Sequence, residues 1–358
     1  MARINIRNIC KKYGAGPGAH TALSDVSMDI QEGGFVALLG PSGSGKTTIL
    51  RAIAGLETLD GGSIEIDGVT VSGPQIHMPP EQRRVAVVFQ NHALWPQMTV
   101  ADNVRFPLLV AQKRNPEIDR RVQDALANVD LLPLADRYPD QLSGGQKQRV
   151  ALARAMVGNP RVILFDEPLA SLDVELRRDM QRLIARARSP KTSIVYVTHN
   201  QEEALALADR VAVLSEGKIH QLDTPLVLSQ EPTTRMVASF VGARNILQAR
   251  VLRSDRPGTV ELALGGYTFT ARCGSVPTRA SAWVSIQPGA FTVAGAEPGL
   301  AMQVDYVFFQ GDAYLVEGRC ASGDGTLLTV RLPLADKPDV GGTCQLRVVD
   351  AWVLPEGA

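Results

Sequence analysis

Short, largely apolar runs recur through the first two thirds of the chain and predict buried strands. Such runs are typical of strands in a parallel sheet with both faces covered. The predicted strands are Phe35–Leu39, Arg84–Phe89, Val162–Phe165 and Ser193–Thr198. Helical patterns at Thr48–Ala54 and Lys147–Val157 lie between them. The alternation of strands and helices predicts an open α/β sheet.

Three other segments alternate polar and apolar residues, which is typical of strands with one exposed face. Ala2–Ile9 and Leu23–Ile30 have this pattern near the N-terminus. Ser63–Asp67 follows two turn-forming glycines and is predicted to be an edge strand.

One long stretch breaks the alternation of strands and helices. Val100–Leu132 has a helical pattern that Pro107 and Pro116 are expected to interrupt. We therefore predict an inserted helical subdomain that spans about residues 91–158.

The sequence pattern changes after Gly242, where turns rich in glycine and proline separate short alternating runs. These runs are Tyr267–Ala271, Tyr314–Glu317, Leu327–Leu332 and Gln345–Val349. They predict a small all-β barrel over residues 241–358, preceded by an α/β domain over residues 1–240.

Composition narrows the possible functions. The 37 basic residues balance 37 acidic ones, which argues against a protein held on nucleic acid by bulk charge. Neither the four cysteines nor the five histidines have metal-ligand spacing. The N-terminus lacks the apolar core of a signal peptide, and no apolar run approaches the length of a membrane span. We therefore expect a cytoplasmic protein whose membrane role would come through partners.

The segment Gly40–Thr48, GPSGSGKTT, matches the phosphate-binding pattern G-x-x-x-x-G-K-[ST]. Phosphate oxygens need several backbone N–H donors at close range, and glycines remove side chains that would block them. Lys46 would add a cation, and the Thr47 hydroxyl suits a Mg²⁺ ligand. A chance glycine-rich turn is the alternative, but the strand before and the helix after favour a phosphate site. The predicted binding residues are Gly40, Pro41, Ser42, Gly43, Ser44, Gly45, Lys46, Thr47 and Thr48.

A second glycine-rich element, LSGGQ at residues 142–146, opens another predicted helix. A helix N-terminus with glycines and a hydroxyl can hold a second phosphate. The alternative is that Ser143 is an ordinary N-cap, which explains the serine but not two successive glycines. The residues concerned are Ser143, Gly144, Gly145 and Gln146.

Polar residues follow three of the predicted buried strands, where ligands bind in open α/β sheets. Gln90 could touch a metal ion or attacking water there, or be a loop residue. Asp166 can hold Mg²⁺ and Glu167 can accept a proton from water, unless they form a solvated acidic turn. His199 fits a contact to a terminal phosphate. Tyr13 could stack on an adenine or be a surface tyrosine.

The ordered set GPSGSGKTT, Gln90, LSGGQ, VILFDEP and Thr198–His199 resembles the ATP-binding cassette superfamily over residues 1 to about 240. The resemblance implies a P-loop NTPase fold that binds ATP and Mg²⁺. It implies that Tyr13 stacks on the adenine and that the metal is bound by Thr47, Gln90 and Asp166. Ser143–Gln146 would be the signature, and Ser171–Asp173 would be the D-loop. Glu167 would be the catalytic base, and His199 would be the switch histidine. Asn200 stands where importer cassettes commonly have an aspartate.

Ser285–Pro288 is similar to a run that recurs in the OB-like TOBE domain of importer ATPases, although Gly289 stands where an acidic residue is common. On this run and its all-β pattern, the C-terminal domain resembles a TOBE domain. The combined resemblance implies an ATP-hydrolysing importer subunit that pairs head to tail, each signature closing on the partner's ATP. It implies two separate transmembrane permease subunits, a periplasmic or extracellular solute-binding protein, no nucleic-acid partner, and a peripheral location on the cytoplasmic face of the inner membrane. The alternatives are a soluble cassette protein of translation or DNA repair, and a C-terminal domain that senses a ligand.

The apolar loop Leu94–Pro96 follows Gln90 and carries Trp95. Exposed apolar groups commonly mark contacts with partners, so this loop could receive a helix of the transmembrane subunit. The alternative is that Trp95 packs within its own subdomain.

Overall fold

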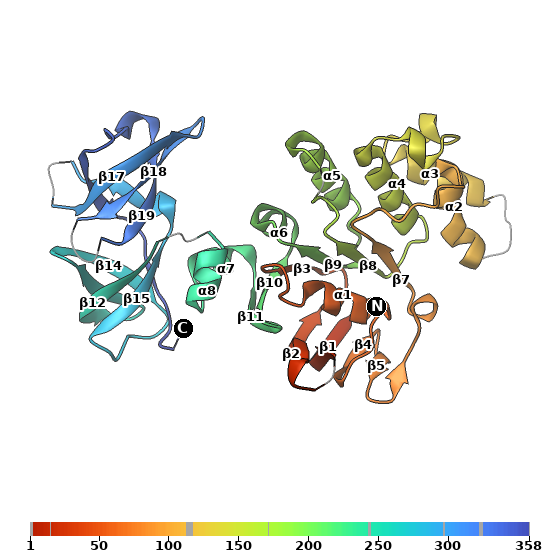
Figure 1. Ribbon diagram of the computed structural model, residues 1–358, viewed down its shortest axis with the longest axis horizontal. Coiled ribbons are helices and arrows are strands. Elements are labelled where there is room, and N and C mark those ends of the chain that lie inside the picture. The colour runs from red at the N-terminus through yellow and green to blue at the C-terminus, as the bar shows by residue number, and fades with distance from the viewer. Residues whose placement is uncertain are drawn as a thin grey trace. The chain divides into compact units, whose positions relative to one another are not determined.

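The computed structural model describes residues 3–14, 16–111, 117–170, 172–242, 245–295, 298–321 and 325–357. Contacts divide the chain into two compact units, Met1–Pro225 and Leu226–Ala358. Residues 226–240 are thus grouped with the C-terminal unit. The α/β cassette followed by an all-β part confirms the predicted fold class (Figure 1).

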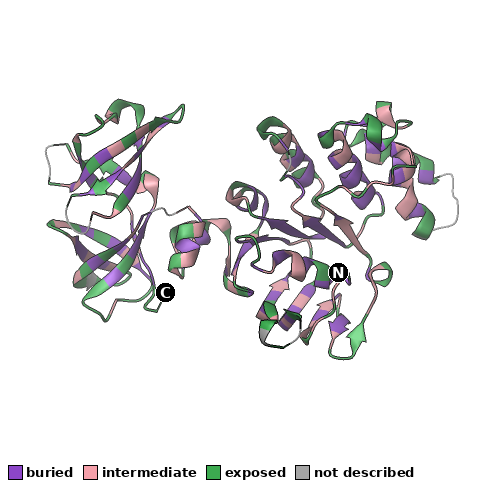
Figure 2. Cartoon of the chain, in the orientation of Figure 1, coloured by how far each residue is buried: buried purple, intermediate pink, exposed green. Residues whose placement is uncertain are grey.

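A six-stranded sheet forms the centre of the first unit, in the order β11-β10-β3-β9-β8-β7. The strands are β3 (Phe35–Leu39), β7 (Val85–Val88), β8 (Val162–Asp166), β9 (Ser193–Thr198), β10 (Arg210–Ser215) and β11 (Lys218–Asp223). All neighbours are parallel except β10 and β11. Every residue of β3 and β9 is buried, which explains their unbroken apolar character (Figure 2).

Helices cover both faces of this sheet. The helix α1 (Lys46–Ala54) packs against β8 and β9, and α6 (Gln201–Leu207) packs against β3 and β9 on the other face (Figure 1). The helix α5 (Val174–Arg186) lies on the same side as α6. Parallel strands place their carboxyl ends at one edge, so the residues that follow β3, β8 and β9 are brought together there.

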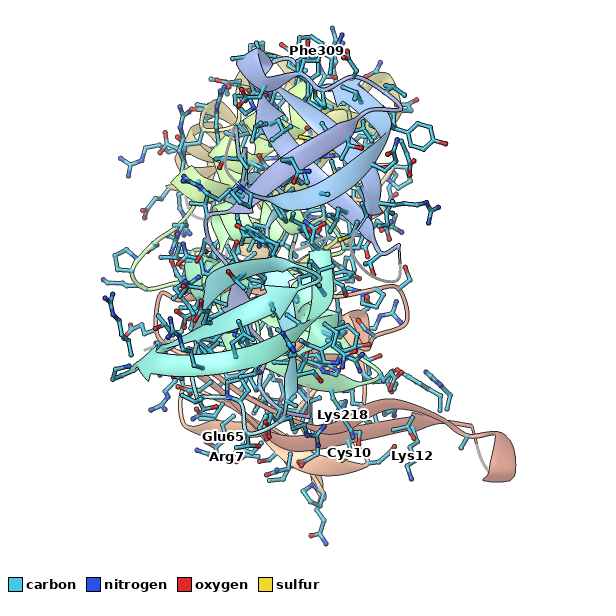
Figure 3. The ribbon with its side chains drawn as sticks, turned by 90° about the vertical axis from the view of Figure 1, so that its left-hand side faces the viewer. Arg7, Cys10, Lys12, Glu65, Lys218 and Phe309 are labelled. Carbon is cyan, nitrogen blue, oxygen red and sulfur yellow. The ribbon has the colours of Figure 1, made fainter. Side chains whose placement is uncertain are left out.

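A second, antiparallel sheet lies below α1, in the order β2-β1-β4-β5-β6. Its strands are β1 (Ile4–Tyr13), β2 (His20–Ile30), β4 (Gly61–Ile66), β5 (Val69–Gly73) and β6 (Ile76–His77). Its inner face shares one apolar core with α1 and the six-stranded sheet. The side chains of Arg7 and Lys12 lie on the outer side (Figure 3).

The prediction that Ser63–Asp67 is an edge strand was wrong. The strand β4 is paired with β1 on one side and β5 on the other. Alternation of polar and apolar residues reports that one face is exposed, and it carries no information about backbone pairing at the two edges.

The helical subdomain contains α2 (Val100–Ala111), α3 (Glu117–Ala127) and α4 (Gly144–Met156), which share an apolar core of their own. Pro107 lies inside α2 and does not interrupt it, contrary to the prediction. Val104 and Leu108 on either side of Pro107 are buried in that core, so packing offsets the cost of the proline. Pro116 lies outside the described residues.

The second unit contains the short helices α7 (Pro225–Gln230), apart from its first residue, and α8 (Arg235–Phe240). A closed barrel follows, in the order β12-β13-β14-β21-β15, formed by β12 (Asn245–Arg256), β13 (Thr259–Leu264), β14 (Tyr267–Cys273), β15 (Ser281–Ile286) and β21 (Trp352–Val353). Gln287 donates to the carbonyl of Ser229 over 2.8 Å and ties the barrel to α7.

A further five-stranded sheet, not anticipated from the sequence, packs on the same apolar core as the barrel. It contains β16 (Phe291–Val293), β17 (Leu300–Phe309), β18 (Ala313–Cys320), β19 (Leu327–Pro333) and β20 (Thr343–Val348). Phe309 ends β17 and is largely exposed (Figure 3). None of the described helices combines the length and the apolar character needed to cross a bilayer.

Candidate functional site

The glycine-rich loop joins β3 to the N-terminus of α1. Gly45 is the N-cap of α1 with φ of 100°, and a Cβ there would lie 2.6 Å from the carbonyl oxygen of Ala22. A Cβ on Gly40 would lie 2.2 Å from the carbonyl oxygen of Leu214. The fold itself therefore requires glycine at both ends of the loop, while Gly43, with φ of 78°, faces open space.

Lys46 is buried inside this loop. Its Nζ donates to the carbonyls of Gly40 and Pro41 over 2.9 and 2.8 Å, and to Ser44 Oγ over 3.3 Å. Burial lowers the pKa of Lys46, an effect opposed by the carboxylates of Glu167 and Asp166. The loop therefore holds its cation in a defined place, as a phosphate site requires.

Asp166 ends β8 and meets the first turn of α1. Its Oδ1 accepts a hydrogen bond from Thr47 Oγ1 over 3.3 Å. Burial raises the pKa of Asp166, and the Thr47 hydroxyl acts against that shift. A hydroxyl and a carboxylate oxygen side by side are the hard ligands that Mg²⁺ prefers, so these residues fit the predicted metal.

Glu167 and His199 face one another across the ends of β8 and β9. His199 Nδ1 lies 3.1 Å from Glu167 Oε2, and the backbone N–H of Glu167 donates to the carbonyl of Val197 over 3.0 Å. Glu167 has φ of 45°, a left-handed conformation that is uncommon outside glycine and found often at functional sites. The two side chains predicted to act at the terminal phosphate are thus in contact.

Several residues predicted to bind the nucleotide surround one hollow. Its lining runs from Tyr13 along the loop residues Ser42–Thr48 to Glu167. Gln90 lies with Asp166, Arg51 and Phe89 around a neighbouring hollow. Since Asp166 also contacts Thr47, the structure brings together the predicted residues from β1, the loop, β8 and the segment after β7.

The signature residues Ser143–Gln146 line neither of these hollows. Ser143 is the N-cap of α4: its Oγ accepts from the N–H of Gln146 over 3.3 Å, and Gln146 Oε1 accepts from the N–H of Ser143 over 2.9 Å. This is the N-cap that the alternative interpretation expected. A Cβ on Gly145 would meet Leu176, whereas one on Gly144 would meet nothing within 4 Å. Packing within the chain therefore explains one of the two glycines.

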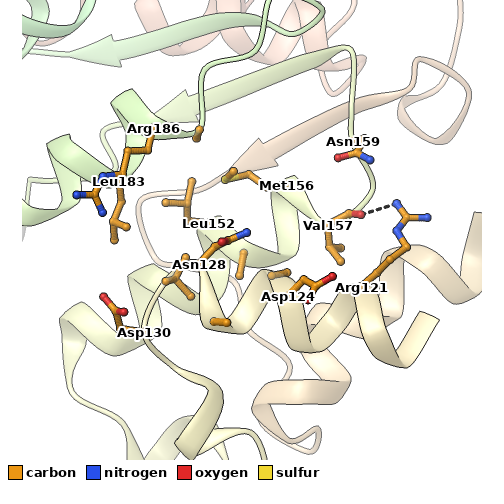
Figure 4. Close-up of a pocket in the computed structure, with 15 residues that line it drawn as sticks. Arg121, Asp124, Asn128, Asp130, Leu152, Met156, Val157, Asn159, Leu183 and Arg186 are labelled. Carbon is orange, nitrogen blue, oxygen red and sulfur yellow. Dashed lines mark hydrogen bonds between the residues drawn. The ribbon is translucent and has the colours of Figure 1, made fainter. Parts of the chain in front are cut away.

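A third hollow lies between α3, the end of α4 and α5 (Figure 4). Arg121 lies at one side of it and donates to the carbonyl of Val157 over 2.7 Å (Figure 4). No residue predicted for the site lines this hollow, so it is separate from the phosphate loop.

The comparisons with known proteins agree with this geometry. Residues 23–170 match the family model described as ABC transporter. The spermidine/putrescine import ATP-binding protein PotA of Nitrosomonas europaea is 43% identical over 290 residues, 80% of this chain and 78% of the relative. The alpha-glucoside transport ATP-binding protein AglK of Rhizobium meliloti is 42% identical over 344 residues, 94% of this chain and 90% of the relative.

The chain belongs to the ATP-binding subunits of ABC transporters. It is an ATPase of the import type, as the sequence predicted, and a role outside transport is not favoured. The dimeric ATP-binding cassette MJ0796, solved in a post-hydrolysis state with ADP and phosphate, matches 62% of this chain and 98% of its own. Its sequence identity is 32% and the TM-score is 0.57.

The ABC subunit also contains site residues that sequence reasoning missed. Glu57 accepts from the Tyr13 hydroxyl over 2.8 Å and pairs with Lys11 over 2.8 Å. Glu203 accepts from Tyr196 and Thr198, next to His199. No local motif marks either glutamate, because the fold brings Glu57 to Tyr13 across 44 positions of sequence.

Trp95, in the apolar loop Leu94–Pro96, is half-buried. Its ring centroid lies 4.4 Å from that of Phe106, and the Arg154 guanidinium lies 4.8 Å from it. The indole is therefore packed in its own subdomain, as the alternative interpretation expected.

Proposed function

We propose that this ABC subunit hydrolyses MgATP with Lys46 and the loop 40–48 on the phosphates, Thr47, Asp166 and Gln90 at the metal, and Glu167 as the base. The observation that carries the proposal is the convergence of the Thr47–Asp166 and Glu167–His199 contacts at the carboxyl ends of β8 and β9. Tyr13 at the other end of the hollow suits a nucleobase.

The chemistry of hydrolysis follows from these positions. Glu167 Oε2 accepts the proton of the attacking water, while His199 Nδ1, 3.1 Å away, holds that carboxylate in place. Lys46 Nζ, anchored to the loop carbonyls, neutralises phosphate charge. When bound, Mg²⁺ supplies further charge neutralisation on the phosphate oxygens.

We infer that a second copy of the chain completes each site. Ser143 and Gly144 are exposed, and a Cβ on Gly144 would meet none of the described residues outside its own helix within 4 Å. A helix N-terminus of this kind binds an anion, yet it lies outside the hollow of its own phosphate loop. A head-to-tail homodimer would place it over the partner's ATP. The dimeric state of the related cassette MJ0796 supports this arrangement.

Mixed dimers test the trans arrangement. Chains with Lys46→Ala and chains with Ser143→Arg are each inactive alone if both motifs are needed. A mixed dimer regains one composite site, made of the intact loop of one chain and the intact signature of the other. Random pairing of equal amounts then restores up to about a quarter of the wild-type rate per chain.

Nucleotide retention is measured on the same mixtures, because turnover in a dimer can require both sites. In a Glu167→Gln background, mixed dimers should retain one nucleotide per dimer where unmixed Glu167→Gln dimers retain two. Mixtures that are inactive and retain no nucleotide would show that each chain acts alone.

The remaining partners are proposed from family membership. We propose that the subunit lies on the cytoplasmic face of the inner membrane, against two permease subunits that receive solute from a binding protein. The related proteins are named for polyamine and for glucoside transport, solutes of very different charge. A solute that crosses through other chains leaves no signature in this ATPase. The C-terminal barrel resembles a TOBE domain and would serve as a regulatory module.

A further inference from the structure

Glu203 is a buried carboxylate that no role above accounts for. It lies in the first turn of α6, and its side chain is 3% exposed. Its Oε2 accepts from the Tyr196 hydroxyl over 2.9 Å and from Thr198 Oγ1 over 2.9 Å. A buried carboxylate is costly unless it is paired and hydrogen-bonded, so this arrangement has to be kept intact for the charge to be tolerated.

The two donors hold the end of β9 immediately before His199. Burial raises the pKa of Tyr196, helped by the nearby Glu203, so its hydroxyl keeps the proton that it donates. Thr198 Oγ1 also accepts from the N–H of Asn200 over 2.9 Å. The hydrogen bonds of the Thr198 hydroxyl thus fix the residues on both sides of His199, namely Thr198 itself and Asn200.

Arg177 connects the same carboxylate to the turn that follows Glu167. Its Nε lies 3.7 Å from Glu203 Oε1, and its Nη2 donates to the carbonyl of Leu172 over 3.0 Å. The Arg177 Nε is buried and has no hydrogen-bond acceptor among the residues that the structure describes. This 3.7 Å separation leaves room for Arg177 and Glu203 to approach each other when the Leu172 turn or α6 moves.

We propose that Glu203 is a positioning residue for hydrolysis, which sets the His199–Glu167 contact through Thr198 and links it through Arg177 to the Leu172 turn. The inference rests on the proposed roles of Glu167 and His199. Leu172 is adjacent to Asp173 in the predicted D-loop, so the linkage joins a segment expected near the partner subunit to the base and the switch histidine.

The geometry predicts which kinetic parameter changes. Glu203 has no hydrogen bond to the phosphate loop or to Tyr13, while its partners fix the residues beside the 3.1 Å His199–Glu167 contact. Loss of its charge should therefore lower kcat and leave the KM for ATP within about twofold. A displacement of about 1 Å in a reacting group can cost 10²-fold, so we expect kcat to fall roughly 10- to 100-fold.

The experiment compares isosteric variants in the full chain. Glu203→Gln removes the charge, and Thr198→Val removes the hydroxyl without changing the shape. Thr198→Ser keeps the hydroxyl and should restore most of the rate. Arg177→Met should also lower kcat, and the double variant Glu203→Gln/Arg177→Met should be no slower than Glu203→Gln alone, because the two residues act through one linkage.

Ser193→Ala is the matched control for the loss of a buried hydroxyl. Ser193 is fully buried in the same strand, where its Oγ donates to the carbonyl of Gln31, roughly 16 Å along the strand from Thr198. It should keep a normal kcat. Binding of a fluorescent ATP analogue and the melting temperature are measured for every variant, and Thr198→Val decides the test if Glu203→Gln fails to fold.

The outcomes separate this inference from the proposed function. Normal hydrolysis by Glu167→Gln and His199→Ala would overturn the proposed roles and the inference with them. If those two variants are impaired while Thr198→Val and Glu203→Gln keep a normal kcat, only the inference is overturned. A raised KM with unchanged kcat would equally contradict it, and additive effects of Glu203→Gln and Arg177→Met would overturn the linkage through Arg177.

Discussion

A Cβ placed on Gly145 would come within 2.2 Å of Leu176 Cδ2, at the contact between the first turns of α4 and α5. The neighbouring Gly144 has nothing within 4 Å of the same position. Two adjacent glycines of the signature therefore have different reasons for being glycine. One is required by packing within the chain, and the other leaves a bare surface at a helix N-terminus.

Alanine substitutions at these two positions should separate stability from hydrolysis. Gly145→Ala forces the α4–α5 contact apart, and overpacking of this kind costs about 1–3 kcal/mol of unfolding free energy. Gly144→Ala should leave the melting temperature unchanged or slightly raised, because alanine favours the helix by about 1 kcal/mol.

Gly144→Ala should nevertheless lower ATP hydrolysis if this surface closes on the partner's phosphates. Thermal melting and steady-state hydrolysis of both variants check the pair. Full activity in Gly144→Ala would mean that the bare surface has no partner during turnover.

Asp166 should reduce the stability of the free protein. Burial raises its pKa above the usual 3.8, so the charged form is less favourable in the folded than in the unfolded state. Asp166→Asn should therefore raise the melting temperature near neutral pH, by about 2–4 °C for each kcal/mol in a domain of this size. The same change should abolish Mg²⁺-dependent hydrolysis, since an amide is a poorer ligand than a carboxylate.

The sign of the pH dependence follows from the raised pKa. Below pH 3.8 the aspartate is neutral in both states, and the variant and the wild type should have similar stability. The difference in unfolding free energy between the variant and the wild type should grow as the pH rises from 3.8 to the folded-state pKa, and it should remain constant above that pKa. Asp179→Asn, at a partly exposed residue of α5 that pairs with Arg182 on the surface, is the control and should shift stability by no more than about 0.5 kcal/mol. A lower melting temperature for Asp166→Asn at pH 7 would contradict the argument.

Tyr13 tests the nucleobase end of the site. The residue is 40% exposed beside the loop, and its hydroxyl donates to Glu57. Aromatic stacking on a base contributes about 1–3 kcal/mol, so Tyr13→Ala should raise the KM for ATP about fivefold or more with little change in kcat. Tyr13→Phe keeps the ring and loses its anchor, so its effect should be smaller.

Aromatic stacking depends little on which base is stacked, so GTP provides a second test of the role of Tyr13. Tyr13→Ala should raise the KM for GTP by a factor similar to that for ATP. Tyr306→Ala, which removes an exposed aromatic ring of the other unit, is the control. An unchanged KM in Tyr13→Ala would return Tyr13 to the alternative of an ordinary surface tyrosine.

How much the sequence could predict depended on whether the signal was local. The strands β3 and β9 were predicted with their observed limits, because a buried parallel strand imposes apolar residues on consecutive positions. The sequence did not predict that β4 pairs on both sides or that α2 continues through Pro107. Backbone pairing and tertiary packing leave little trace in the sequence of a single segment.

The candidate site shows the same division between local signals, which the sequence contains, and contacts between distant segments, which it does not. Glu167 and His199 each come directly after an apolar strand, and that position predicted a function for both. Their mutual contact, and the Glu203 carboxylate beneath it, come from elements that are distant in sequence. Ser171 of the predicted D-loop lies outside the described residues, whereas Leu172 and Asp173 follow it into α5.

The proposed general base, Glu167, provides the last prediction. Glu167 is the carboxylate next to Asp166, the proposed metal ligand, and its left-handed backbone and contact with His199 fix its orientation. Glu167→Gln keeps the shape and removes the basicity, so hydrolysis should fall by about 10²- to 10⁴-fold. Binding of ATP and Mg²⁺ should persist, since Lys46, Thr47 and Asp166 are unchanged. The variant should then accumulate as an ATP-bound dimer, seen by gel filtration as an ATP-dependent shift to larger size.

Three further variants give this experiment its controls. Lys46→Ala should neither bind ATP tightly nor form the dimer, because it lacks the cation of the phosphate loop. Glu175→Gln, at an exposed glutamate in the first turn of α5, should hydrolyse ATP normally. His199→Ala should slow turnover less than Glu167→Gln does, since it loosens the base without removing it. Near-normal hydrolysis by Glu167→Gln, under conditions where Lys46→Ala is inactive, would show that another group or the phosphate itself accepts the proton.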